Sequence, residues 1–291
     1  MQDAVRLKSF ELFARDIGSV DVSLLHALSI SVGWPHRPKD WEFLLSVGEG
    51  IVAVDGIGRV FGSAMWFPHG DDFATIGLVI TTPRTQAQGN GRWLMDQVLA
   101  RCAGRDLALN STRAAYILYH SLGFATEGQV YMHQGVMPPV TAARLVLKGE
   151  IEALAPDALA EIAALDHAAF GADRMAHLKG LAETASIQVL RRGGAIVGYS
   201  MCRPFGRGHV IGPIVASSDN DAIHLTAVHL DGLGGQFVRV DTRSEGAFAD
   251  FLRRNGLPAA ETVTTMSKGR RILTERPGEP IVFGLAGHAL G

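Results

Sequence analysis

The first half of the chain alternates between short β-rich runs and longer stretches in which apolar residues recur at helical spacing. Residues 52–56 lead through an Asp-Gly turn into residues 60–65, which is typical of an antiparallel hairpin. Further strands are expected over 73–80 and 106–109, and a final pair of strands over 127–133. Helices are expected over 21–31, 40–47 (with Asp40 as N-cap), 91–103 and 113–121. This mixture of helices with a largely antiparallel sheet indicates the α+β class.

The same order of elements recurs weakly after about 135 residues. A second hairpin is expected over 189–201 and its following strand over 211–215, and the Leu-Gly-Phe of residues 122–124 returns as an Asn-Gly-Leu. Because the three offsets agree within a few residues, they indicate two copies of one fold, each a mixed, largely antiparallel sheet flanked by helices. Paired prolines mark a connection between the copies. The expected division is a first domain over 1–136, a linker over 137–146 and a second domain over 147–291.

Composition narrows the class of protein. Of the 291 residues, 47% are hydrophobic and 19% are charged, as expected of a chain that buries a full core. The formal net charge is only -2 and no Lys/Arg run exceeds two residues, which argues against a nucleic-acid partner. No apolar stretch approaches the ~20 residues of a membrane span, so a cytoplasmic protein without a membrane partner is expected. Cys102 and Cys202 are expected to be reduced, buried thiols.

A glycine-containing loop joins the strand that ends near Ile80 to the helix that follows. Gly89 and Gly91 stand where this loop turns into the helix. Glycines let the backbone approach an anion, and the first amides of a helix point toward it, so a pyrophosphate suits the site. The loop lacks both the Lys-Ser/Thr ending of a nucleoside-triphosphate loop and a Gly-x-Gly-x-x-Gly fingerprint. The alternative is that the two glycines only shape a tight connection.

A second motif favours the phosphate site. Gln86-x-x-Gly89-x-Gly91 resembles the Gln/Arg-x-x-Gly-x-Gly/Ala signature of the GNAT N-acetyltransferase superfamily. Residues 109–124 resemble that superfamily's Leu-x-Ala-Thr…Leu-Tyr-x-x-Leu-Gly-Phe segment, with serine where alanine is commoner, and the spacing of about thirty residues also fits. The resemblance covers roughly residues 5–135 with both motifs and the second copy in fold only. The chain is similar to a bacterial subgroup of tandem GNAT proteins with an active N-terminal and a degenerate C-terminal domain.

The resemblance implies that acetyl-CoA is the cosubstrate. Backbone groups of the strand before the loop would hold the pantetheine arm, the loop amides would hold the pyrophosphate, and an asparagine would add a polar contact. The residues expected to bind acetyl-CoA are Leu78, Val79, Ile80, Gln86, Ala87, Gln88, Gly89, Asn90, Gly91, Arg92 and Asn110. No metal is expected. His224 and His229 lie five apart on an expected helix, so they face different sides as ordinary surface histidines.

Tyr119 matches the superfamily's general acid. A tyrosine hydroxyl, with a reference pKa of about 10, stays protonated at neutral pH and can donate to a departing thiolate. The alternative is a core aromatic on an apolar helix face. No general base stands out: Asp72, His120 and His133 are candidates, and ordered water is another.

Trp34 and His36 lie in the loop between the first two helices, which by the resemblance forms a wall of the acceptor site. An aromatic ring and an imidazole would suit an amine through cation–π and hydrogen-bond contacts. The alternative is that Trp34 packs the loop between its prolines.

The second copy lacks both chemical features of the first. No glycine pair follows its strand at 211–215, and Asp219 and Asp221 stand at the start of its helix, where they would repel a phosphate. Leu252 occupies the position that corresponds to Tyr119. This domain is therefore expected to be non-catalytic and to serve as a lid, a substrate wall or a dimer surface, which leaves a homodimer open.

These observations favour an acetyl-CoA-dependent N-acetyltransferase that transfers an acetyl group to the primary amine of a small molecule by direct attack on the thioester. One alternative is acetylation of a protein or peptide amine. Another is a non-catalytic acyl-CoA-binding sensor.

Overall fold

The computed structural model describes residues 4–7, 10–139, 148–272 and 278–291. In the first half the strands are β1 (Ala4–Leu7), β2 (Phe10–Asp16), β3 (Glu49–Val54), β4 (Val60–His69), β5 (Phe73–Thr81), β6 (Asp106–Ser111) and β7 (Ala125–Val136). The helices of this half are α1 (Val22–Ser31), α2 (Pro38–Val47), α3 (Asn90–Arg101) and α4 (Tyr116–Ser121), with a short 3-10 turn, η1 (Ile17–Ser19).

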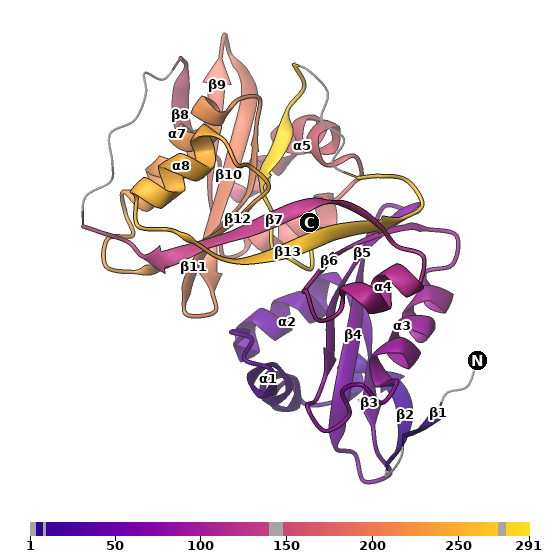
Figure 1. Ribbon diagram of the computed structural model, residues 1–291. Coiled ribbons are helices and arrows are strands. Elements are labelled where there is room, and N and C mark those ends of the chain that lie inside the picture. The colour runs from indigo at the N-terminus through magenta and orange to yellow at the C-terminus, as the bar shows by residue number, and fades with distance from the viewer. Residues whose placement is uncertain (1–3, 8–9, 140–147, 273–277) are drawn as a thin grey trace.

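The second half repeats this order from β2 onward, with β8 in the place of β2, and adds one strand, β14, at its end. Its strands are β8 (Glu150–Ala153), β9 (Ser186–Arg192), β10 (Ala195–Phe205), β11 (Gly208–Ala216), β12 (Phe237–Thr242), β13 (Ala259–Lys268) and β14 (Ile281–Gly284). Its helices are α5 (Ala163–Phe170), α6 (Met175–Ala182), α7 (Asp219–Leu230) and α8 (Ala247–Arg254), with a 3-10 turn, η2 (Pro156–Ile162). The predicted α+β class and the duplicated, largely antiparallel arrangement are confirmed (Figure 1).

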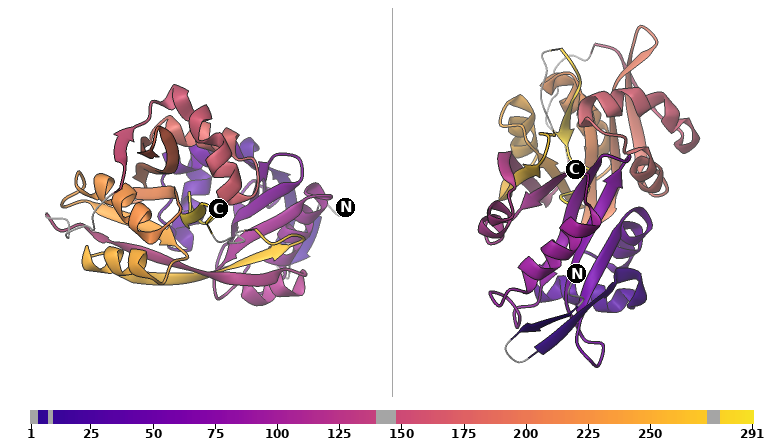
Figure 2. Two further views of the ribbon diagram at one scale, coloured as in Figure 1. Left: turned by 90° about the horizontal axis from the view of Figure 1, so that it is seen from above. Right: turned by 90° about the vertical axis from the view of Figure 1, so that its right-hand side faces the viewer.

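All the described strands join one sheet in the order β1-β2-β3-β4-β5-β6-β13-β7-β12-β14-β11-β10-β9-β8. The two halves therefore exchange strands at the centre. Strand β13 of the second half lies between β6 and β7, and β7 of the first half lies between β13 and β12, antiparallel to both. Figure 1 shows these two long strands side by side across the middle of the molecule, and the left view of Figure 2 shows them along its lower edge. The expected final β-pair over 127–133 is wrong, because β7 is a single strand whose two partners both come from the other half.

Local signals placed most helices correctly. Helix α1 begins after Asp21, whose carboxylate accepts a hydrogen bond from the Ser23 amide at 2.7 Å. The prediction of Asp40 as the N-cap of α2 is wrong: this helix begins at Pro38, since proline suits the first helical turn. Asp40 lies two residues inside the helix and accepts a hydrogen bond from the Arg37 amide at 2.7 Å.

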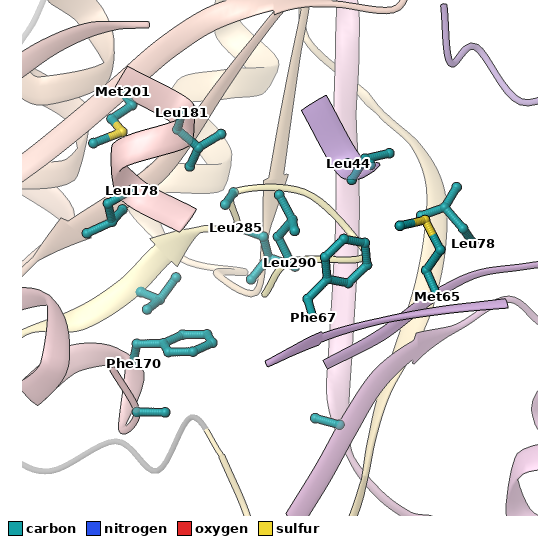
Figure 3. Close-up of a cluster of buried hydrophobic side chains, with 14 of the residues drawn as sticks. Leu44, Met65, Phe67, Leu78, Phe170, Leu178, Leu181, Met201, Leu285 and Leu290 are labelled. Carbon is teal, nitrogen blue, oxygen red and sulfur yellow. The ribbon is translucent and has the colours of Figure 1, made fainter. Parts of the chain in front are cut away.

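One hydrophobic cluster joins the two halves. Phe67 of β4 lies beside Leu285 and Leu290 of the C-terminal segment, and Leu178 and Leu181 of α6 close the cluster from the second half (Figure 3). These side chains are almost fully buried. A second cluster lies under α3 and α4 of the first half, and a third under α7 and α8 of the second.

The expected domain boundaries stay a prediction, since residues 140–147 of the expected linker lie outside the described residues. Cys102 and Cys202 are buried, and the structure pairs neither of them in a disulfide. Within the described ranges, the helices are too short or too polar for any of them to span a membrane.

Candidate active site between the two halves

The loop between β5 and α3 presents a row of unpaired amides. The N–H groups of residues 87–92 have no hydrogen-bond acceptor in the part of the chain that the structure describes, and the first helical bond runs from Trp93 to the Gly89 carbonyl. Two residues in left-handed backbone conformations shape the loop, Ala87 with φ 57° and Gly89 with φ 96°. A Cβ on Gly89 would meet no atom within 4 Å, so this side of the loop is open. Such a row of amides at a helix start binds anions.

Side chains of the loop hold it in shape without covering its amides. Gln86 donates from Nε2 to the Thr81 carbonyl at 3.2 Å, and Gln88 donates to the Arg84 carbonyl at 2.8 Å. The buried Asn90 side chain donates to the Thr85 hydroxyl at 3.2 Å. The loop is therefore formed before any ligand arrives. The predicted roles of residues 86–92 in binding acetyl-CoA are compatible with this arrangement and stay predictions.

Beside the loop, β5 parts from β6. The two strands run parallel and pair only from Phe73 opposite Asp106 to Ile76 opposite Leu109, and beyond that point β6 pairs with β13 alone. At the parting, Leu78 has φ 51°, a left-handed conformation that costs a leucine about 1–3 kcal/mol. The Ser63 hydroxyl donates to the Leu78 carbonyl at 2.7 Å and holds the distortion. The backbone of residues 78–80 therefore borders a gap between two strands, where an extended ligand can pair with it.

Tyr119 lies in the apolar cluster that α3 and α4 pack against the sheet. Its ring meets the Phe124 ring edge to face, with the centroids 6.1 Å apart, and the side chain is 6% exposed. Within the described ranges its hydroxyl has no hydrogen-bond partner. Burial raises the pKa of this hydroxyl, so it stays protonated at neutral pH. Tyr119 is not among the residues that line the cavity described next, and its role as general acid stays a prediction.

A cavity of about 710 Å³ lies between the halves at the point where β5 and β6 part. Its walls come from loop 33–37, from Gly77 and Leu78 of β5, from the turn at 203–207 and from the C-terminal segment at 287–290. Trp34 and His36, predicted to contact the acceptor, both line it, with their ring centroids 5.8 Å apart. Burial lowers the pKa of His36 to about 4, so its imidazole is neutral at pH 7.

The C-terminal segment crosses from the second half to complete this cavity. Asn110 donates from Nδ2 to the His288 carbonyl, and Thr75 donates from Oγ1 to the Ala289 carbonyl, both at 2.8 Å. Gly77 makes room for the crossing, since a Cβ there would lie 2.3 Å from the Ala289 Cβ. The Asn110 side chain is thus engaged within the protein, because its Oδ1 also accepts from the Thr265 hydroxyl at 2.8 Å. Its predicted contact with the cosubstrate remains untested.

A buried carboxylate of the second half faces the cavity together with a histidine of this segment. Asp241 of β12 is fully buried and accepts two hydrogen bonds of 2.8 Å from the Arg239 guanidinium. His288 Nε2 lies 3.4 Å from the same carboxylate. Burial alone would raise the pKa of Asp241, but the charge of Arg239 and the adjacent ring of His288 outweigh it and hold the pKa well below its usual range. Asp241 is therefore ionised at neutral pH.

None of the three candidate bases named from the sequence lines the cavity. Asp72 directly precedes the first residue of β5, at the end of the strand away from the cavity, and it forms an ion pair with Arg270. His120 lies at the end of α4. His133 is buried on β7, with Nδ1 2.8 Å from the Leu257 carbonyl. Sequence reasoning missed Asp241 and His288 because each is a single polar residue, 163 and 210 positions after Leu78, with no local spacing to connect them.

In the second half, the positions that correspond to the open helix start and to the gap between strands are occupied by the protein's own groups. At the start of α7 the Ser218 hydroxyl caps the Asp221 amide at 3.2 Å. Asp219 accepts from the Phe248 amide at 2.7 Å, so the helix start is occupied by acidic side chains. Between β11 and β12, where the first half has its gap, β14 is inserted and pairs with both strands. Leu252 is fully buried, as expected of a core residue.

The expectation that His224 and His229 are surface histidines is wrong. Their side chains are 5% and 7% exposed, because α7 packs against the sheet and beside α8. Across the described residues, no group of three or more His, Cys, Asp or Glu side chains has the geometry of a metal site.

Comparison with known proteins places both halves in one family. The model of the acetyltransferase (GNAT) domain matches residues 162–281, and a second model of the same description matches residues 47–126. The chain is therefore a tandem member of the GNAT acetyltransferases. Searching the curated proteins returns no match.

Solved structures share the fold over the whole chain. A Pyrococcus horikoshii protein described as an acetyltransferase has a TM-score of 0.80 at 18% identity, covering 100% of this chain and 99% of that one. A GCN5-related N-acetyltransferase from Sphaerobacter thermophilus has a TM-score of 0.60 at 18% identity, covering 92% and 96%. A tandem GNAT protein from the clavulanic acid biosynthesis pathway has a TM-score of 0.60 at 14% identity, covering 91% and 99%. These likenesses show the fold alone.

Proposed function

We propose that the protein is an acetyl-CoA-dependent N-acetyltransferase that acetylates the primary amine of a small molecule. The observation that carries the proposal is the row of open amides at residues 87–92 beside the unpaired edge of β5. A pyrophosphate held at the helix start directs an attached extended arm along that edge. The arm then ends at Leu78, where the cavity begins.

The cavity supports a small acceptor. Its volume of about 710 Å³ is within the range of small-molecule sites, and both halves and the C-terminal segment supply its walls. A protein or peptide amine would instead need an open groove across the site. A non-catalytic sensor would need no acceptor cavity beside the parted strands.

The proposed chemistry is direct acyl transfer. Acetyl-CoA supplies a thioester whose carbonyl carbon forms a bond to the amine nitrogen as its bond to sulfur breaks. An amide of residues 79–80 donates to the carbonyl oxygen as negative charge develops there, and it needs no reorganisation to do so. Tyr119 gives its hydroxyl proton to the departing thiolate.

We propose His288 as the group that removes the proton from the attacking amine. Its Nε2 lies 3.4 Å from the Asp241 carboxylate, an ion-pair distance once the ring is protonated, and no side chain or carbonyl of the described residues hydrogen-bonds to Nδ1. A carboxylate on one nitrogen orients the ring and stabilises the imidazolium that forms when the other nitrogen takes a proton. The C-terminal segment would thus supply the base to a site whose cosubstrate is held by the first half.

The overall proposal is tested by two measurements. Titration calorimetry with acetyl-CoA is expected to show binding, and thiol release over a panel of small amines is expected to show turnover. Binding without turnover of any amine would favour the sensor. Turnover of peptide N-termini or lysines alone would favour the protein acetyltransferase.

Tyr119→Phe is expected to lower kcat about 100-fold, because proton donation by a positioned side chain contributes at least that much. The dissociation constant for acetyl-CoA is expected to change less than about threefold, since the substitution removes one hydroxyl and leaves the loop amides intact. The matched control is Tyr116→Phe on the same helix, whose hydroxyl lies 3.0 Å from that of Thr126. Equal turnover in both variants would remove the assignment of Tyr119.

His288→Gln is expected to lower kcat about 100-fold with acetyl-CoA binding retained, because an amide cannot accept the amine proton. Stopped-flow measurement of acetyl transfer reports the chemical step directly. His120→Gln serves as the control, since His120 is exposed on α4 and does not line the cavity. A His288→Gln enzyme with wild-type kcat would contradict the proposed base and leave the acetyltransferase proposal standing.

A further inference from the structure

Arg203 is a buried cation in the cavity wall without an acidic partner. It lies on β10 and its side chain is 6% exposed. Its Nη2 donates one hydrogen bond, to the Ala286 carbonyl at 3.1 Å, while its buried Nε–H has no acceptor. Among the described residues no carboxylate comes within ion-pair distance of it. A buried guanidinium with most of its donors unused is costly unless a ligand satisfies it.

The neighbouring charges are already paired with one another. Arg37 forms an ion pair with Asp40 at 3.0 Å, and Asp40 also accepts from the Gly206 amide at 3.1 Å. Arg239 forms its ion pair with Asp241 at 2.8 Å. Arg37 and Arg239 are thus neutralised by carboxylates, whereas the buried Arg203 is not. Burial lowers the pKa of Arg203 to about 10, so it keeps its charge at neutral pH.

Aromatic rings hold the Arg203 guanidinium in place. Its central carbon lies 5.3 Å from the centre of the Phe43 ring and 5.2 Å from that of the Phe205 ring. Phe43 belongs to α2 of the first half and Phe205 to β10 of the second, so the cation is held where the halves meet. Such cation–π contacts orient the group but do not neutralise its charge.

We propose that Arg203 binds a carboxylate of the acceptor, so that the substrates are amines that also carry a carboxylate, as free amino acids do. This inference rests on the proposed acetyltransferase function. A planar guanidinium matches a carboxylate through two parallel hydrogen bonds. The cavity wall contains four arginines and three carboxylates, so the arginines exceed the carboxylates by one. A monoanion balances that excess, whereas a phosphate dianion would leave a negative charge in the site.

Matched pairs of acceptors test the inference with the wild-type protein. Each pair is an amino acid and its decarboxylated amine: lysine and cadaverine, ornithine and putrescine, phenylalanine and phenethylamine. A charge-assisted pair of hydrogen bonds predicts that kcat/KM favours the carboxylate-bearing member by about 10- to 100-fold. Equal or better turnover of the decarboxylated amines would overturn the inference while leaving the acetyltransferase function intact. Turnover of other amines of the panel but of none of these pairs would also overturn the inference and leave the acetyltransferase function standing, whereas turnover of no amine at all would contradict both.

Arg203→Met then tests whether the preference for carboxylate-bearing acceptors depends on Arg203. The variant keeps an unbranched apolar side chain between the two rings and is expected to abolish the preference within each pair, mainly through a 10- to 100-fold rise in KM for the amino acid. Arg254→Met is the control, because Arg254 is exposed on α8 and does not line the cavity. Its preference is expected to match that of the wild type. Thermal unfolding and acetyl-CoA titration check that the Arg203 variant is folded. A folded variant that keeps the preference would overturn the assignment to Arg203.

Discussion

Gly89→Glu is expected to abolish measurable binding of acetyl-CoA, with a rise of at least about 100-fold in the dissociation constant. Gly89 has φ 96°, a conformation that costs other residues about 1–2 kcal/mol and that the loop needs in order to present its amides. The new carboxylate would also occupy the open side of the loop and repel the pyrophosphate. Titration calorimetry with acetyl-CoA measures the loss.

Gly104→Glu separates this effect from backbone strain. Gly104 follows the other end of α3 and has φ 87°, and a Cβ there, as at Gly89, would meet no atom within 4 Å. The two variants are expected to lose similar stability, but Gly104→Glu is expected to bind acetyl-CoA as the wild type does. Loss of binding in both, or in neither, would contradict a pyrophosphate site at the start of α3.

Asp166→Ala is expected to lower the free energy of unfolding by about 3–5 kcal/mol, because it leaves a buried arginine without its counter-ion. Asp166 is 2% exposed and accepts three hydrogen bonds from Arg174, at 2.8, 3.0 and 3.1 Å. The Tyr199 hydroxyl donates to the same carboxylate, and Arg174 also donates to the Gly291 carbonyl at 3.1 Å. Urea denaturation followed by circular dichroism gives the change.

The exposed pair of Arg253 and Asp250 provides the comparison. Both side chains are 48% exposed, so solvent screens their attraction, and Asp250→Ala is expected to cost less than about 1 kcal/mol. If Asp166→Ala and Asp250→Ala lowered the free energy of unfolding equally, the prediction that the buried ion pair is the costlier one to break would be wrong.

Elements with local signals could be predicted from the sequence. The Asp-Gly turn specified the β3–β4 hairpin, and Asp21 marked the start of α1. The glycine loop before α3 could be located because its proposed role depends on backbone conformation. A glycine such as Gly89 in the sequence marks a position where that conformation is left-handed. Two local signals competed at the start of α2: Asp40 as a possible N-cap and Pro38 as a possible first helical residue. The proline determined where the helix begins.

Features that depend on distant partners could not be predicted. The alternation along β7 indicates a strand, but it does not say whether the neighbouring strand comes from the same half or the other. The cavity joins Leu78 to Arg203 and to His288, which are far apart in sequence and belong to different halves. A lone arginine in an apolar strand signals nothing until the fold shows that no carboxylate of the described residues forms an ion pair with it. Motifs therefore did not reveal the part of the cavity wall that the second half supplies, whereas Trp34 and His36 of the first half were predicted.

Strands β7 and β13 each pair with strands of the other half, as exchanged strands do between the two chains of a domain-swapped dimer, but here both halves belong to one polypeptide. Separating the two halves would break three ladders at once, β13–β6, β13–β7 and β7–β12, which is far costlier than turning about a hinge. A ligand of the cavity is therefore expected to enter and leave while the halves stay joined, past the loop at 33–37 and the turn at 203–207, which line the cavity outside the sheet.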